Sequence, residues 1–337
     1  MVPKRITDPA TADFRDLEQC LAANQAHVLQ FSDVTYTPGL LEEVGALAAR
    51  FGDLLEVRFY GHETGGFDCA VLEKIPSVTN LSIDCLRRAS NIEALAQLAH
   101  LNTLSLGIEE LSDADVLAYP NLRRLRDLTI GESKSDALDL SHLNAFSELE
   151  RLRICGHTRG IQALTAVRSL KCLWLNRIGK QTRLDFLSEL DNLHTLGLLL
   201  GGRASIAEIE LPHLAELDIS LVKGLVDLGD LARFRELRSL RIDQQARLEA
   251  IAFSQANAEL RSVYLVHCKS LRSLSGLENL PRLEQLLIWS PVLNRQELLS
   301  LKLPQSLAIC SLYTSKERED ALIRAELDAR GYRERES

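Results

Sequence analysis

The chain has 337 residues, and 66 of them are leucine, whereas aromatic residues make up only 5%. This bias indicates a repeated packing unit, and it excludes a disordered chain, a collagen and a small disulfide-stapled domain. Thirty-nine basic and 47 acidic residues leave a net charge of −8, which disfavours nucleic acid and anionic membranes as partners.

The cysteines and the start of the chain bear on the compartment. The seven cysteines are scattered and contain no Cys-x-x-Cys pair, as is typical of reduced cytosolic thiols. No apolar stretch follows the basic residues at the amino terminus, so they do not resemble a signal peptide. No run approaches the roughly 18 apolar residues of a membrane span. We therefore expect a soluble cytoplasmic protein.

Residues 1–53 are expected to form a helical amino-terminal cap. Apolar side chains have helical spacing over residues 14–21, and a second amphipathic stretch covers residues 38–51. A looser segment at residues 27–33 has room for one irregular first repeat, which would add a strand. A cap is expected because the terminal coils of a stacked structure expose apolar edges.

Residues 54–312 contain twelve segments related to the motif L-x-x-L-x-L. Neighbouring segments are 21 to 24 residues apart, which predicts about 11 to 12 repeated units. The fourth residues of the segments are Val57, Leu81, Leu104, Leu128, Leu152, Leu173, Leu196, Leu217, Leu240, Val263, Leu286 and Leu307.

Two hydrophobic periods occur inside each unit. The alternating residues of L-x-L are typical of one face of a β-strand. Upstream of each strand, apolar residues recur at every third position, as in Ile92, Leu95 and Leu98, which suits 3₁₀ turns and extended connectors better than an α-helix. Because both stripes must face one interior, we predict an α/β solenoid with a parallel sheet on one side.

Residues 313–337 are expected to form a closing helix and a charged tail. Thr314 and Glu317 have the spacing of a capping box, and helically spaced apolar residues follow as far as a stop at Gly331. The chain shows no Pro-rich or Ser-rich linker, so we expect one continuous solenoid with caps.

The repeat resembles the leucine-rich-repeat family, whose consensus is L-x-x-L-x-L-x-x-N/C-x-L. The spacing of its leucines looks like the short-repeat subtype of phosphatase-regulatory and internalin-type proteins. The resemblance implies a horseshoe with a concave parallel sheet, a 3₁₀ or irregular convex side and helical caps. At the consensus Asn/Cys position only Cys268 agrees, so other groups must satisfy the backbone after the strands. Glu208 and Asn257 also stand where the ladder expects apolar residues.

Catalytic motifs are scarce. The chain lacks the phosphate-loop, dinucleotide-binding, zinc-protease and serine-hydrolase signatures. The fragments Cys155-Gly156-His157 and His267-Cys268 could make a thiolate pair or zinc ligands, but they lie five coils apart, roughly 24 Å at the spacing of parallel strands. We expect buried thiols and loop histidines instead, and no enzyme, metal or cofactor.

The residues between and just after the two strand leucines point away from the core, onto what we call the exposed sheet face. Both tryptophans of the chain fall there, and aromatic residues and arginine on an open surface are typical of binding hot spots. The candidate partner-binding residues are Arg58, Tyr60, Arg153, Trp174, Asp218, Arg241, Asp243, Tyr264, Leu287 and Trp289.

The repeat register also predicts neighbours on this face. Arg241 is expected beside Asp218 and the Tyr264 ring, and Arg153 beside Trp174. An apolar patch is also expected near the carboxyl end, formed by Tyr264, Val266, Leu287 and Trp289. Two alternatives stay open, namely that these residues merely cover the sheet, or that binding uses the convex side.

The resemblance implies that the concave sheet engages another protein. We favour a non-enzymatic protein-protein interaction module that acts as a cytosolic inhibitor or antidote, like an immunity protein, by masking its partner. One alternative is an adaptor or a regulatory subunit for a cytosolic enzyme such as a phosphatase. Another is the substrate-selecting part of an effector enzyme, which the lack of a catalytic module disfavours, as the lack of a signal peptide disfavours a secreted adhesin. The oligomeric state is left open.

Overall fold

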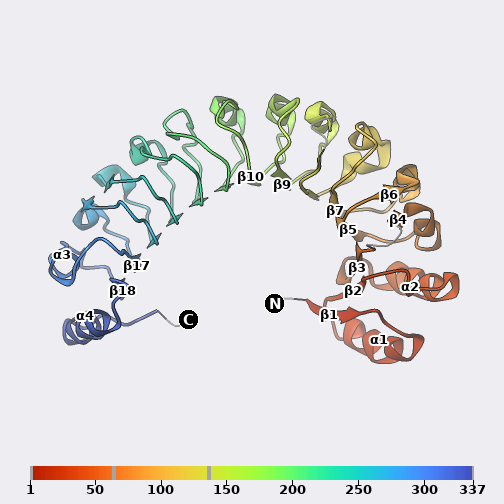
Figure 1. Cartoon of the computed structure of the whole chain (residues 1–337), viewed down its shortest axis with the longest axis horizontal. Coiled ribbons are helices and arrows are strands. Elements are labelled where there is room, and N and C mark those ends of the chain that lie inside the picture. The colour runs from red at the N-terminus through yellow and green to blue at the C-terminus, as the bar shows by residue number, and fades with distance from the viewer. Residues whose placement is uncertain (1–2, 63–65, 135–137, 336–337) are drawn as a thin grey trace. The chain divides into compact units, whose positions relative to one another are not determined.

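The computed structural model describes residues 3–62, 66–134 and 138–335. The chain divides into two compact units, unit 1 (Met1–Leu170) and unit 2 (Lys171–Ser337). In each unit, parallel strands form one side and most of the short 3₁₀ helices form the other (Figure 1). Each unit is therefore an α/β solenoid of leucine-rich repeats, as the sequence predicts.

The sheet of unit 1 is parallel, and its described strands follow one another in chain order. They are β1 (Lys4–Thr7), β2 (His27–Phe31), β3 (Leu55–Gly61), β5 (Asn80–Leu86), β7 (Thr103–Ile108), β8 (Asp127–Ile130) and β9 (Arg151–Cys155). Two further strands, β4 (Phe67–Asp68) and β6 (Ala89–Ser90), form a separate parallel pair.

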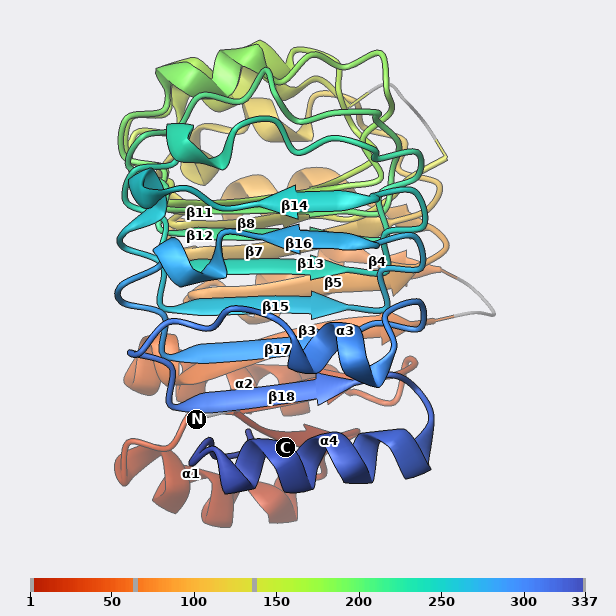
Figure 2. The same ribbon diagram turned by 90° about the vertical axis from the view of Figure 1, so that its left-hand side faces the viewer.

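The sheet of unit 2 has the same order. Its strands are β10 (Cys172–Asn176), β11 (Thr195–Leu199), β12 (Glu216–Ser220), β13 (Ser239–Asp243), β15 (Ser262–Val266), β17 (Gln285–Trp289) and β18 (Ile309–Tyr313). Strands β14 (Ala250–Ala252) and β16 (Ser273–Ser275) pair outside this sheet (Figure 2).

Helices complete the coils. The α-helices are α1 (Phe14–Ala22), α2 (Pro38–Phe51), α3 (Arg295–Leu299) and α4 (Glu317–Ala329). Two 3₁₀ helices of the described chain, Thr11–Asp13 and Gly52–Leu54, lie where a helical cap was predicted. The others lie upstream of repeat strands, as the three-residue period predicts. They are Cys69–Lys74, Ile92–Gln97, Val116–Ala118, Pro120–Arg124, Leu140–Ala145, Ile161–Ala166, Asp185–Glu189, Leu231–Arg233, Gln255–Asn257 and Leu277–Asn279.

The leucine ladder sets the register of the strands. Leu81 lies opposite Leu104 in unit 1, and Leu217 lies opposite Leu240 in unit 2. All four are buried, and a fully buried leucine contributes about 2 kcal/mol of transfer free energy. A shift by one residue would turn each of these side chains to solvent, so burial holds the register.

The register predicted for the last repeat is wrong. Leu286 lies opposite Cys310 rather than Leu307, so strand β18 starts one ladder step later than expected. The apolar residues recur at every third position here, which allows a slip of three residues, and the buried Cys310 takes the place of a leucine. The correction puts Ser311 and Tyr313 on the exposed sheet face.

At the consensus Asn/Cys position, two different side chains bind carbonyl groups in unit 2. The Gln245 amide donates to the Ile219 carbonyl oxygen at 3.3 Å and to that of Asp243 at 2.8 Å. The Cys268 thiol reaches the carbonyl oxygens of Ile242 and Val266 at 3.8 and 3.6 Å. Each side chain therefore joins its coil to the preceding one, which satisfies buried carbonyl groups.

Polar residues at the two breaks in the ladder have partners. Glu208 pairs with the buried Arg203 at 2.7 Å. The amide of Asn257, which is 2% exposed, donates to the Leu231 carbonyl oxygen at 2.9 Å. These contacts offset the cost of placing polar groups where leucine is expected.

The ends of the described chain differ in part from expectation. Strand β1 was not predicted, and it extends the sheet beyond β2. Helix α2 begins at Pro38, where the Thr37 side chain accepts a hydrogen bond from the Leu40 amide. The predicted capping box at Thr314 is wrong, because the Thr314 hydroxyl donates instead to Asp320 at 2.7 Å.

Candidate functional site

The strand pairing places the predicted binding residues in rows on the exposed sheet face. In unit 1, Arg58 lies opposite Ser82. In unit 2, Asp218, Arg241 and Tyr264 occupy neighbouring strands of one row. Leu287, on the neighbouring strand, continues that row. Arg153 and Trp174 belong to different units, so the contact expected between them stays a prediction.

In unit 1, Arg58 is held by its neighbours. Its guanidinium pairs with Asp84 at 2.7 Å and lies over the Tyr60 ring, 4.7 Å from the ring centre. Burial lowers the pKa of Arg58, but the hydrogen bond and charge of Asp84 outweigh it and raise that pKa above its usual value. Tyr60 also receives a hydrogen bond from Gln30. Arg58 and Tyr60 therefore stabilise one another and contact neighbouring side chains of unit 1.

Beside this cluster the exposed sheet face of unit 1 is hollowed. The hollow has a volume of about 720 Å³, and Gly107 and Gly131 lie in its lining. A Cβ atom on Gly131 would lie 2.8 Å from the Gly107 Cα atom, so the two backbones approach closely because neither residue has a side chain. Arg87 and Glu109 add charge to the lining.

In unit 2, Trp174 lies across the sheet over Gly197. The two residues are paired in register, and a Cβ atom on Gly197 would lie 2.0 Å from the indole Cε3 atom. Glycine is therefore needed at this position for the indole to lie flat. The indole is only partly buried, so an apolar surface remains open on β10.

Two aspartates share one arginine in the middle of unit 2. The Arg241 guanidinium lies 3.0 Å from Asp243 and 3.7 Å from Asp218. Burial raises the pKa of Asp218, and the hydrogen bond from Ser220 and the charge of Arg241 oppose that rise. The predicted pairing of Arg241 with Asp218 is thus present, although its shorter contact is to Asp243.

Tyr264 has a different cationic neighbour from the one expected. The guanidinium over its ring belongs to Arg335, 4.5 Å from the ring centre. The Tyr264 hydroxyl donates to Gln285 at 2.7 Å. Sequence reasoning missed Arg335 because no repeat unit includes it.

An aromatic group surrounds Trp289, which is 37% exposed. The His267 ring lies 4.2 Å from the indole and the Tyr313 ring lies 6.2 Å from it, measured between ring centres. The indole N–H donates to the Ser315 hydroxyl. Val266, which was expected in the same patch, is buried, so the open apolar surface consists of Trp289 with the half-buried Leu287 and Tyr313. Aligning the last repeat on Cys310 would have revealed Tyr313.

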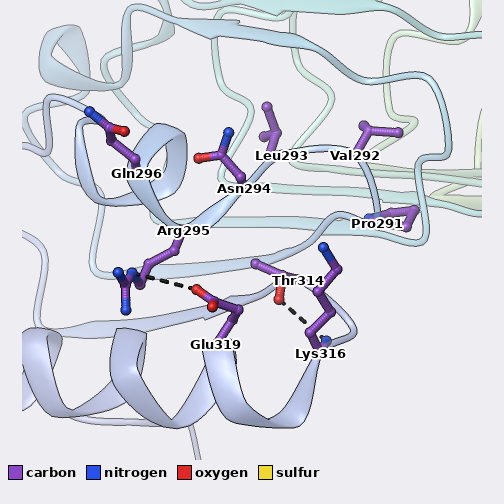
Figure 3. Close-up of a pocket in the computed structure, with 9 residues that line it drawn as sticks. All are labelled: Pro291, Val292, Leu293, Asn294, Arg295, Gln296, Thr314, Lys316 and Glu319. Carbon is purple, nitrogen blue, oxygen red and sulfur yellow. Dashed lines mark hydrogen bonds and ion pairs between the residues drawn. The ribbon is translucent and has the colours of Figure 1, made fainter.

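Another hollow lies in unit 2, between α3 and the start of α4 (Figure 3). Its volume is about 350 Å³. An ion pair of 3.5 Å joins Arg295 to Glu319 across it, and Pro291 and Val292 form an apolar rim. Its lining includes none of the candidate partner-binding residues.

Cys268 and its chain neighbour His267 are not arranged as a catalytic pair. Burial raises the pKa of the Cys268 thiol to about 11, and its chain neighbour His267 faces Trp289 instead. Burial likewise raises the pKa of Cys69 and of Cys310 to about 12. These thiols are therefore protonated and weakly nucleophilic at neutral pH. His157 contacts the Gly131 carbonyl oxygen at 3.1 Å.

Within residues 3–62, 66–134 and 138–335, His, Cys, Asp and Glu side chains make no group of three or more that could hold a metal ion. Over the same described part of the chain, no helix combines the length and apolar character that crossing a membrane requires.

Comparison with known proteins finds similar folds among solved structures. No protein-family model and no curated protein sequence matches the chain. An internalin from Listeria monocytogenes is 17% identical over 81% of this chain and 86% of its own, with a TM-score of 0.46. A leucine-rich-repeat protein of Leptospira interrogans is 16% identical over 97% and 98%, with a TM-score of 0.46. The leucine-rich-repeat domain of APL1B is 13% identical over 91% and 86%, with a TM-score of 0.48.

The leucines recur with the repeat, the strands pair in the register that buries them, and 3₁₀ helices close the coils. By its repeat and its strand register, each unit has the fold of leucine-rich repeats.

Proposed function

We propose that the chain is a non-enzymatic module that binds a partner protein through the exposed sheet face. The observation that carries this proposal is the open apolar surface of Trp289 with Leu287 and Tyr313 in unit 2. Packing of the leucine core does not require large aromatic side chains on the opposite face of the sheet. Exposed aromatic residues of this kind are typical anchors of protein interfaces.

Charge supports a protein as the partner. The net charge of −8 disfavours nucleic acid. In unit 2, Asp218 and Asp243 share Arg241, so the middle of the row offers both signs of charge for polar contacts around an aromatic anchor. The protonated thiol of Cys268 and the contact of its neighbour His267 with the Trp289 ring support a binding role rather than catalysis.

We further propose that the bound partner is masked, so that the chain acts as a cytosolic inhibitor or antidote. Cys69, Cys268 and Cys310 are buried free thiols, which suits a reducing compartment. Masking is also the simplest action for a chain that works by binding alone. The adaptor alternative differs in one respect, namely that the activity of a bound enzyme would survive saturation with this protein.

The binding face is tested with the double variant Trp174→Ala/Trp289→Ala. Loss of two aromatic anchors should weaken binding of a captured partner about 100-fold in a titration by calorimetry. The matched control is Val226→Ala/Leu322→Ala, which removes two apolar side chains that are 51% and 46% exposed and lie off the rows. Equal loss in both variants, or no loss in the first, would exclude the aromatic face as the binding site.

A further inference from the structure

Residues 332–335 lie along the open edge of β18, next to the strand. The Cys310 amide donates to the Arg333 carbonyl oxygen at 2.9 Å, and the Arg333 amide donates to that of Ala308 at 3.0 Å. The bridge between Ile309 and Arg333 is parallel. The Arg335 amide adds a hydrogen bond to the Ser311 hydroxyl at 3.1 Å. The tail thus satisfies main-chain groups that an edge strand leaves unpaired.

Two side chains of the tail are recognised by charge and by ring contact. Glu334 accepts a hydrogen bond from the Tyr313 hydroxyl at 2.5 Å and forms an ion pair with Arg324 of α4. Arg335 places its guanidinium over the Tyr264 ring, two strands inward from β18. The edge of β18 therefore has one position that binds a carboxylate, followed by one that binds a guanidinium.

The tail is attached by exchangeable contacts. Helix α4 packs beside β18 (Figure 2), and a hollow of about 610 Å³ remains between this helix and the tail, lined by Arg324, Asp328 and the tail itself. Tyr332, Arg333 and Arg335 are not among the buried residues. Ion pairs and ring contacts between exposed groups are individually weak, so a competing segment does not have to overcome a packed core.

We infer that the edge of β18 is an acceptor site for an extended segment with the sequence Glu-Arg, and that residues 332–335 occupy it until a partner segment of the same chemistry displaces them. Addition of a strand to a sheet edge is a common mode of peptide recognition, in which main-chain hydrogen bonds supply affinity and side-chain positions supply specificity. Tyr313 and Arg324 select the carboxylate, and Tyr264 selects the guanidinium. This site shares Tyr264 and Tyr313 with the exposed sheet face, but its test does not depend on Trp174 or Trp289.

The test uses the full-length variant Glu334→Gln/Arg335→Ala and a fluorescein-labelled peptide of residues 331–337, GYRERES. Because the altered tail competes less well, the peptide should bind the variant about tenfold more tightly than it binds the wild type, measured by fluorescence anisotropy. The control peptide carries the same two substitutions, and its affinity for the variant should be about tenfold lower than that of the native peptide. Equal binding of native and control peptides would overturn the inference.

A second pair of proteins covers the case in which the altered tail still occupies the edge of β18. A chain shortened to end at Gly331, with its fold checked by circular dichroism, should also bind the native peptide. Adding Tyr264→Ala to the shortened chain should weaken that binding about tenfold. If neither the point variant nor the folded shortened chain binds the peptide, the inference is wrong, whatever the result for the Trp174→Ala/Trp289→Ala test.

Discussion

Replacing Gly197 by alanine should lift Trp174 off the sheet. The added Cβ atom would lie 2.0, 2.4 and 2.5 Å from three indole carbons, whereas ordinary contact begins at 3.4 Å. The ring must therefore move by about 1.4 Å or rotate outward. Because the face is open, the indole can move without disturbing the leucine core, and we expect the free energy of unfolding to fall by only about 1 kcal/mol, at the low end for overpacking.

The displacement can be measured by fluorescence. The chain has two tryptophans, so a Trp289→Phe background leaves Trp174 as the only one. In that background, Gly197→Ala should raise acrylamide quenching and shift the emission to longer wavelength. Gly202→Ala is the matched control, because a Cβ atom there would meet only a carbonyl oxygen at 3.7 Å. Unchanged quenching after Gly197→Ala would refute the position of the indole over this glycine.

Gln244 has a φ of +52° and is exposed, so Gln244→Gly should raise the free energy of unfolding by about 1 kcal/mol in urea titration while Gln244→Ala should not. Hydrogen bonds from Arg88 and neighbouring basic side chains lower the pKa of Glu110 from 4.5 to about 2. The stabilisation of the fold by ionised Glu110 should be complete above pH 4.5 and lost as the pH falls towards 2. This pH dependence should be absent in Glu110→Gln. A Glu110 pKa near 4.5 in an NMR titration would contradict the prediction. Iodoacetamide at pH 8 should label the exposed Cys85 well before the buried Cys268, as mass spectrometry can establish.

The strand register of most coils is predictable because burial has only one solution for alternating leucines. Within each unit, pairs such as Leu81 with Leu104 lie opposite each other as the spacing requires. The prediction fails at β18, where the three-residue ladder permits a slip and a thiol stands in for a leucine at Cys310. Composition alone does not separate Leu307 from Cys310, since both are buried apolar residues.

The candidate site is predictable in its rows but not in its contacts. The repeat assigns Arg241 and Tyr264 to neighbouring strands, yet side-chain torsions decide that Arg241 turns to Asp243. Arg335 reaches Tyr264 because the chain returns along β18 after α4. A return of this kind depends on the path of a non-repeating segment, and a repeat alignment contains no information about it.

The side chains that join neighbouring coils also limit how unit 2 could be re-engineered. An amide at Gln245 and a thiol at Cys268 each reach back to a carbonyl group of the preceding coil, but at different distances and with different donor strength. Duplicating or exchanging one coil would pair a donor with a carbonyl at the wrong distance, even if every leucine were retained. When coils of unit 2 are rearranged, each coil should therefore be moved together with the coil that precedes it.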